Sequence, residues 1–177
     1  ILSLVILLND PKDKINILFS SISFGVVLWS IAILGFLSSN FNFFTPEIWL
    51  TLTHTAAAFI ALLFLYFSLN FPTALIKNKY ITVLPMITFI IIIYFLFFTK
   101  FIIGDIFLQT YEINHGYIFY GEYIISLFTL GYLSLFFQYK KTRDILQKTQ
   151  LKYIFVGSLL SSTLATITDL AFPYLGI

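Results

Sequence analysis

The sequence predicts an all-α membrane protein, a polytopic helical bundle, and two observations on composition support that fold class. Hydrophobic residues make up 59% of the 177 residues and charged residues only 10%, and the mean hydropathy is +0.96. Soluble domains usually carry about a quarter charged residues, so these few charges could not cover a water-exposed surface. The chain therefore needs lipid around much of its apolar surface.

The third observation is the length of the apolar stretches, since a helix needs about 20 residues to cross a bilayer. Five stretches approach that length, at residues 15–37, 48–71, 81–98, 120–139 and 153–172. The apolar segment before them is short, and its helical rise of about 12 Å covers less than half of a ~30 Å hydrocarbon core. We interpret this segment as the end of a truncated first helix. The expected architecture is a truncated seven-helix bundle, with five complete helices and one remnant.

The charges of the connecting loops predict how the helices are oriented. Nine of the ten Lys and Arg residues fall in or beside the loops at 9–14, 73–80 and 140–152, and Lys100 is the exception. The positive-inside rule makes these three loops cytoplasmic. The loops at 38–47 and 99–119 are then extracytoplasmic, and membrane lipids are expected partners.

The loop at 99–119 has two interpretations. Residues 106–113 and 117–120 are rich in β-formers, and 114–116 (Asn-His-Gly) between them suit the turn of a small β-hairpin. An irregular interfacial loop agrees with the sequence equally well. Residues 140–150 are polar and compatible with helix, so we expect them to extend two of the helices beyond the membrane.

Missing residues and motifs exclude several classes of function. The chain has no Cys, and its two His residues are too few for a His-rich metal centre. Motifs of soluble enzymes, such as a phosphate-binding loop or a serine-nucleophile motif, are also missing. The net charge of +2 is too small to indicate nucleic-acid binding. We expect no enzyme activity from this fragment, and no cofactor, metal or nucleic acid.

Three ionisable residues at similar depth predict a small polar pocket that opens to the outside. Asp169 lies inside the last apolar stretch, His54 lies about two turns into another, and Glu122 begins a third. An intramembrane carboxylate is costly and usually faces protein or a water-filled cavity. The expected walls of this ligand-binding pocket are Trp29, Trp49 and Tyr123. In the alternative, His54 bonds a neighbouring Thr or carbonyl, and both acids lie at the wet interface.

Small residues recur at every fourth position of the last apolar stretch. Gly157, Ser161 and Ala165 share one helical face there. Small residues on one face let two helix backbones approach closely within lipid. We therefore predict that this face packs against another helix.

Patterns along the whole chain resemble one known family. Trp29 follows the segment NDPKDKINILF, and residues 67–72 form a Phe-rich helix end before a proline. Residues 150–154 read QLKYI, Gly157 follows one turn later, and residues 172–176 read FPYLG. Their order and spacing resemble the N-terminal seven-transmembrane sensor region of bacterial membrane histidine kinases. The resemblance implies an extracellular start, a seventh helix that leads to the cytoplasm, and no catalytic residues in this region.

Topology and resemblance together predict one integral membrane sensor domain over residues 1–177, which lacks the seventh helix and the output domain. Such a signal-input module in the bacterial cytoplasmic membrane would pass an external or membrane cue to a cytoplasmic output domain of the same chain. That domain would be a histidine kinase or a cyclase, and kinase linkage implies a homodimer. A transporter or channel subunit is the alternative, although the inner halves of the helices at 48–71 and 81–98 have few polar groups. A membrane enzyme that uses Asp169 and His54 as acid and base lacks a substrate motif.

Overall fold

Helices that are long and apolar enough to cross a membrane form most of the structure, a computed structural model that describes residues 2–38, 44–72, 79–107 and 110–175. Five such helices occur within these ranges. They are α2 (Lys14–Leu37), α3 (Pro46–Asn70), α4 (Lys79–Phe98), α5 (Gly116–Lys141) and the run that begins with α6 (Ile145–Thr166). That run continues through a π-helical segment, η1 (Ile167–Ala171), into α7 (Phe172–Leu175). The prediction of an all-α bundle with helices long and apolar enough to span a membrane is confirmed, and the truncated seven-helix architecture stays a prediction.

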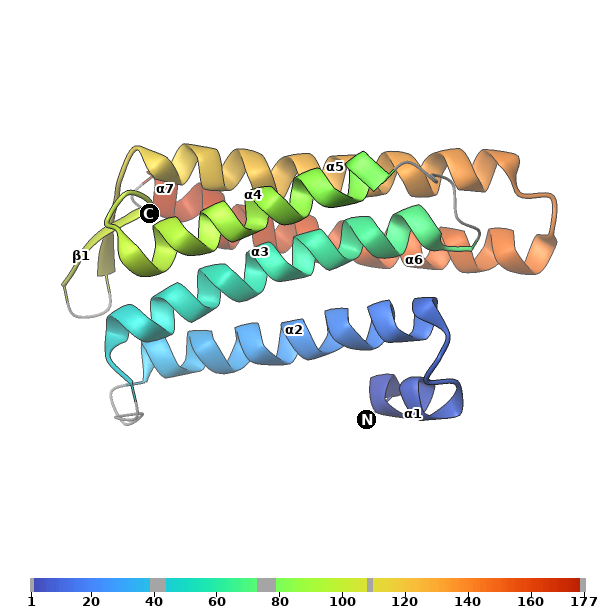
Figure 1. Ribbon diagram of the computed structural model, residues 1–177, viewed down its shortest axis with the longest axis horizontal. Coiled ribbons are helices and arrows are strands. Elements are labelled where there is room, and N and C mark those ends of the chain that lie inside the picture. The colour runs from blue at the N-terminus through green and yellow to red at the C-terminus, as the bar shows by residue number, and fades with distance from the viewer. Residues whose placement is uncertain (1, 39–43, 73–78, 108–109, 176–177) are drawn as a thin grey trace.

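The helix boundaries follow capping residues as well as hydropathy. Asp13 caps α2 by accepting a hydrogen bond from the backbone N–H of Ile15 (3.0 Å), and Asp144 caps α6 in the same way. Because of Asp144, α6 begins within the polar segment between the apolar stretches, as predicted, and α5 extends to Lys141. The remnant forms α1 (Leu2–Asn9), which lies beside the first turns of α2 (Figure 1).

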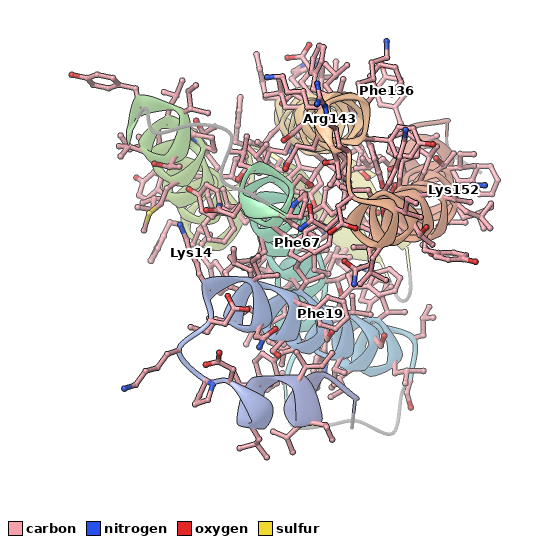
Figure 2. All side chains as sticks on the ribbon, turned by 90° about the vertical axis from the view of Figure 1, so that its right-hand side faces the viewer. Lys14, Phe19, Phe67, Phe136, Arg143 and Lys152 are labelled. Carbon is pink, nitrogen blue, oxygen red and sulfur yellow. The ribbon has the colours of Figure 1, made fainter. Side chains whose placement is uncertain are left out.

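Helix α3 lies at the centre of the bundle. In the end-on view of Figure 2 it is surrounded by the other long helices. Ala58 and Ala61 are fully buried, so neighbouring helices can approach its backbone closely. Helices α2, α4 and α6 instead leave most of their apolar side chains exposed, as expected where lipid replaces water.

The two ends of the bundle differ in charge. Figure 2 faces the end that carries Lys14, Arg143 and Lys152, which we call the basic end. The opposite end carries a small antiparallel sheet and is called the hairpin end; there Lys100 forms an exposed ion pair with Asp105. The structure therefore separates the charges along the helix axes as the loop pattern predicts.

The sheet at the hairpin end pairs β1 (Ile103–Phe107) with β2 (Thr110–Ile113). The predicted turn at residues 114–116 is wrong, because these residues lead directly into α5 and residues 117–120 are helical. The physical reason is that buried side chains recur every three or four positions there, at Tyr117, Tyr120 and Ile124, which is a helical period. Gly116 also lies against Phe101, whose carbonyl oxygen would be 2.5 Å from an added Cβ.

Aromatic side chains fill the space between α3, α5 and α6 in the middle of the bundle. This aromatic layer consists of Phe64, Phe128, Tyr132 and Phe155, with ring centroids 4.9–5.5 Å apart in the three closest contacts. On its basic side, Leu135 and Leu151 are 1% exposed. Buried polar groups also join α5 to α3 there, because the side chains of Ser134 and Gln138 both donate to the carbonyl oxygen of Ser68.

Candidate functional site

A cavity of about 650 Å³ lies in the hairpin half of the bundle, between α2 and α6 and lined also by α3 and α5. Helix α2 packs against α3, and α6 packs against α5, so the two flanking helices have different main partners. They come together near the basic end, where Leu18 of α2 and Ile154 of α6 join one cluster with Phe67. Phe64 and Phe128 of the aromatic layer line the cavity, which is therefore closed on its basic side.

His54 forms part of the cavity wall and is 6% exposed. Its Nδ1 lies 2.9 Å from the carbonyl oxygen of Leu50, one turn earlier on α3, so Nδ1 carries the proton of that hydrogen bond. Three tyrosine rings surround the imidazole, with centroid distances of 5.8, 6.0 and 5.3 Å to Tyr111, Tyr117 and Tyr120. The alternative prediction, a hydrogen bond from His54 to a nearby carbonyl, thus holds for Nδ1. The imidazole ring also lines the cavity, as the pocket prediction expects.

Two of the three tyrosine hydroxyls donate hydrogen bonds to backbone oxygens that belong to cavity-lining residues. Tyr120 donates to the backbone oxygen of His54 (2.9 Å), and Tyr117 donates to the backbone oxygen of Asp169 (2.7 Å). Tyr111 interacts with Tyr117 through its side chain. Burial raises the pKa of Tyr111, which reaches the bundle from β2.

Asp169 lies in the π-helical segment η1 and also lines the cavity. Its Oδ1 is 3.0 Å from the hydroxyl of Thr168. Single π-helical turns within α-helices are rare and often occur at functional sites. Asp169 and His54 thus both line the cavity, and Tyr117 contacts both, through its hydroxyl to the Asp169 backbone oxygen and through its ring to the His54 imidazole.

The other predicted pocket residues divide between this cavity and other places. Trp29 of α2 lines the cavity, whereas Glu122, Trp49 and Tyr123 do not. Glu122 is exposed, because it lies two positions after buried Tyr120 and so about 200° further around α5.

Trp49 and Tyr123 each make a helix contact instead. The indole of Trp49 covers Gly35 of α2, and its centroid is 5.2 Å from that of Phe44. Tyr123 points to α4, where its hydroxyl donates to the carbonyl oxygen of Pro85 (3.4 Å).

Three tyrosines of the site were not predicted from the sequence. Residues 117–120 were expected to form a hairpin strand or an irregular loop, although the spacing of Tyr117, Tyr120 and Ile124 is a helical signal that could have placed both tyrosines on one buried face. No comparable signal exists for Tyr111, because a loop residue reaches the bundle only through the path of the chain.

The predicted packing face of α6 borders the cavity. Ser161 and Ala165 line it, and nothing lies within 4 Å of a Cβ added to Gly157. Within the described ranges, no helix covers this row, and its packing role stays a prediction. The described residues contain no group of three His, Cys, Asp or Glu that could hold a metal ion.

Comparison with protein-family models, curated proteins and solved structures finds no match to this chain.

Proposed function

We propose that the chain is the membrane-embedded signal-input module of a bacterial signalling protein and passes an external or membrane cue to a cytoplasmic output domain of the same polypeptide. The observation that carries this proposal is the cavity, which has apolar walls and a polar cluster around His54 and is closed on its basic side. Cavities of roughly 300–1,000 Å³ with a few polar groups are typical of small-molecule sites.

The position of the cavity suggests how binding would become a signal. A molecule inside it touches four helices at once, so its binding energy depends on how these helices are arranged. A ligand shifts an equilibrium between two arrangements only by its difference in affinity for them. Helix α6 is the element best suited to move, because only Leu151 of its residues is buried and η1 interrupts its regular hydrogen bonding.

The proposed orientation has the basic end in the cytoplasm, according to the positive-inside rule. The cavity then lies in the outer half of the membrane, where an external or lipid-dissolved molecule can reach it. The resemblance to the seven-transmembrane sensor region of histidine kinases adds a seventh helix, a kinase output domain and a homodimer to this proposal.

A transporter or channel subunit is the rival, and the contacts of the basic half argue against it. Transport needs a polar route through both leaflets. On the basic side of the cavity, the aromatic layer and the buried residues Leu135 and Leu151 fill the space between α3, α5 and α6. The buried polar groups there, Ser134 and Gln138, are bonded to the backbone of Ser68.

The test is to fill the cavity in the full-length gene product and to measure its output. Ala165 lines the cavity, so Ala165→Phe places a ring in it, whereas Thr163→Phe adds a ring to an exposed position of the same helix that does not line it. We expect Ala165→Phe to change the rate of autophosphorylation, or of the reaction of whichever output domain follows, and Thr163→Phe to leave it unchanged. Equal output from both variants at equal membrane abundance would contradict the proposal.

A further inference from the structure

We propose that the cavity binds an apolar molecule with a single ammonium group, which lies beside His54 and Asp169 while the apolar body extends between α2 and α6. This inference rests on the proposed function and deepens it by naming the chemical class of the ligand.

The walls require a ligand that is mostly apolar. Aliphatic and aromatic side chains from α2, α3, α5 and α6 dominate the lining, among them Val26, Ile33, Ile60 and Ile124. A polar group placed against them would lose its hydrogen bonds to water and gain none. The hydrophobic effect therefore favours an aliphatic or ring body over most of the cavity.

Most hydroxyls that line the cavity already donate their protons to the protein. The hydroxyl of Tyr120 donates to the His54 carbonyl. Ser161 and Thr53 donate to carbonyls one turn earlier in their own helices, both at 3.0 Å. These oxygen atoms keep lone pairs, so they can accept a hydrogen bond from a ligand but have no free proton to give.

The side chains of His54 and Asp169 are acceptors as well. In the neutral ring, His54 Nε2 is an acceptor because Nδ1 donates to Leu50. The carboxyl group of Asp169 also only accepts when it is ionised, as it would be beside a bound ammonium. Among the described lining residues, the structure gives no acceptor to two donors, the Trp29 indole and the Thr166 hydroxyl. The polar cluster therefore suits a ligand group that donates several hydrogen bonds.

Charge selects an ammonium over a neutral donor such as a hydroxyl. Asp169 is the one acid among the described lining residues, and no Lys or Arg is among them. At the same end of the bundle lie Glu47 and Glu112, while Lys100 is paired with Asp105. Their field would attract cations and repel carboxylate or phosphate head groups. The aromatic faces around His54 would stabilise an ammonium further.

The experiment compares three probes with the same tail, decylammonium, decanol and decanoate, on the chain in phosphatidylcholine nanodiscs. The chain has two Trp residues, and Trp29 lines the cavity whereas Trp49 does not. In a Trp49→Phe background, Trp29 fluorescence thus reports occupancy, and empty nanodiscs correct for partition into lipid. We expect decylammonium to bind about tenfold or more tightly than decanol, the usual effect of a charge-assisted hydrogen bond, and decanoate to bind most weakly.

A matched pair of variants tests whether the ammonium group binds inside the cavity. Asp169→Asn should reduce decylammonium affinity about tenfold, to that of decanol, whereas Glu122→Gln removes an exposed acid outside the cavity and should have no effect. Unchanged decanol binding by Asp169→Asn would show that the variant keeps a folded cavity. Equal affinity for all three probes, tighter binding of decanoate, or an unaltered decylammonium affinity in Asp169→Asn would overturn the inference.

The binding and output measurements together separate this inference from the proposed function. If decylammonium binds with the expected selectivity but Ala165→Phe leaves the output unchanged, the ammonium site stands and the signal-input role fails. If filling the cavity changes the output but the three probes do not differ, the signal-input role stands and the ligand class is wrong.

Discussion

Replacement of Gly35 by Ala should weaken the contact between α2 and α3 next to the cavity. A Cβ added at Gly35 would lie 2.4–2.6 Å from three atoms of the Trp49 indole. Carbon atoms in contact are normally about 3.5–4.0 Å apart, so the helices must separate by roughly 1 Å or the indole must turn. The indole cannot move freely, because Trp49 is 8% exposed and packs against Phe44.

Two effects of opposite sign set the size of this loss. Overpacking of a filled interface costs about 1–3 kcal/mol. A helix interior gains up to about 1 kcal/mol when Gly becomes Ala. We expect a net loss of about 1–2 kcal/mol in the free energy of unfolding, measured by circular dichroism during an SDS titration in mixed micelles. Gly121→Ala is the control, since nothing lies within 4 Å of a Cβ there, and it should be neutral or stabilising.

A double-mutant cycle shows whether the loss arises at Trp49. Trp49→Ala removes the ring that Gly35→Ala would strike, so the second substitution should cost less in the presence of the first. We expect a coupling of about 1 kcal/mol. Additive effects of the two substitutions, or equal stabilities of the Gly35→Ala and Gly121→Ala variants, would refute this account of the contact.

Three further predictions follow from the cavity and its tyrosines. Ser161→Leu should weaken decylammonium binding because Ser161 lines the cavity, whereas Gly157→Leu should not, since Gly157 adjoins open space; a loss in both variants would instead favour a packing role for the row. Tyr120→Phe should reduce the free energy of unfolding by about 0.5–1.5 kcal/mol, because it removes one buried hydrogen bond to the His54 carbonyl, and an unaltered SDS midpoint would contradict that bond. Burial raises the pKa of Tyr111, so folding is favoured while the phenol is neutral, and this stabilisation decreases as pH rises above the ordinary value of 10.0. A Tyr111→Phe variant should therefore lose less of its free energy of unfolding than the parent when the pH rises from about 9 to about 11, the range around the ordinary tyrosine pKa.

Hydropathy and loop charge predicted most of the fold, because lipid requires long apolar helices and leaves little choice of secondary structure. The boundaries were less accurate where the chain leaves the membrane. Helix α6 begins at Ile145, inside the polar segment that was expected to extend it, but hydropathy does not report the Asp144 cap that sets this first residue. Helix α5 begins at Gly116, where β-forming tyrosines are held in a helix by their buried face.

The sequence predicted how deep in the membrane the site residues lie, but not toward which side of its helix each side chain points. Depth follows from position along an apolar stretch, which places Asp169 and His54 at the same level. Direction is harder to infer, because a helix that is apolar on all sides has no polar face to show which side meets protein. For this reason the sequence could not separate Trp29, which lines the cavity, from Trp49 and Glu122, which do not.

The most direct test of the central claim is a distance measurement at the basic end, far from the cavity. The chain has no Cys, so spin labels can be placed specifically at Ile17→Cys of α2 and Tyr153→Cys of α6, both exposed positions. Pulsed electron–electron double resonance measures the distance between the two labels. Ala165→Phe should shift it by about 1–2 Å or more, the scale of helix shifts in switching proteins, while Thr163→Phe should not. Identical distance distributions in the parent and in the Ala165→Phe variant would contradict the claim that cavity occupancy reaches the basic end.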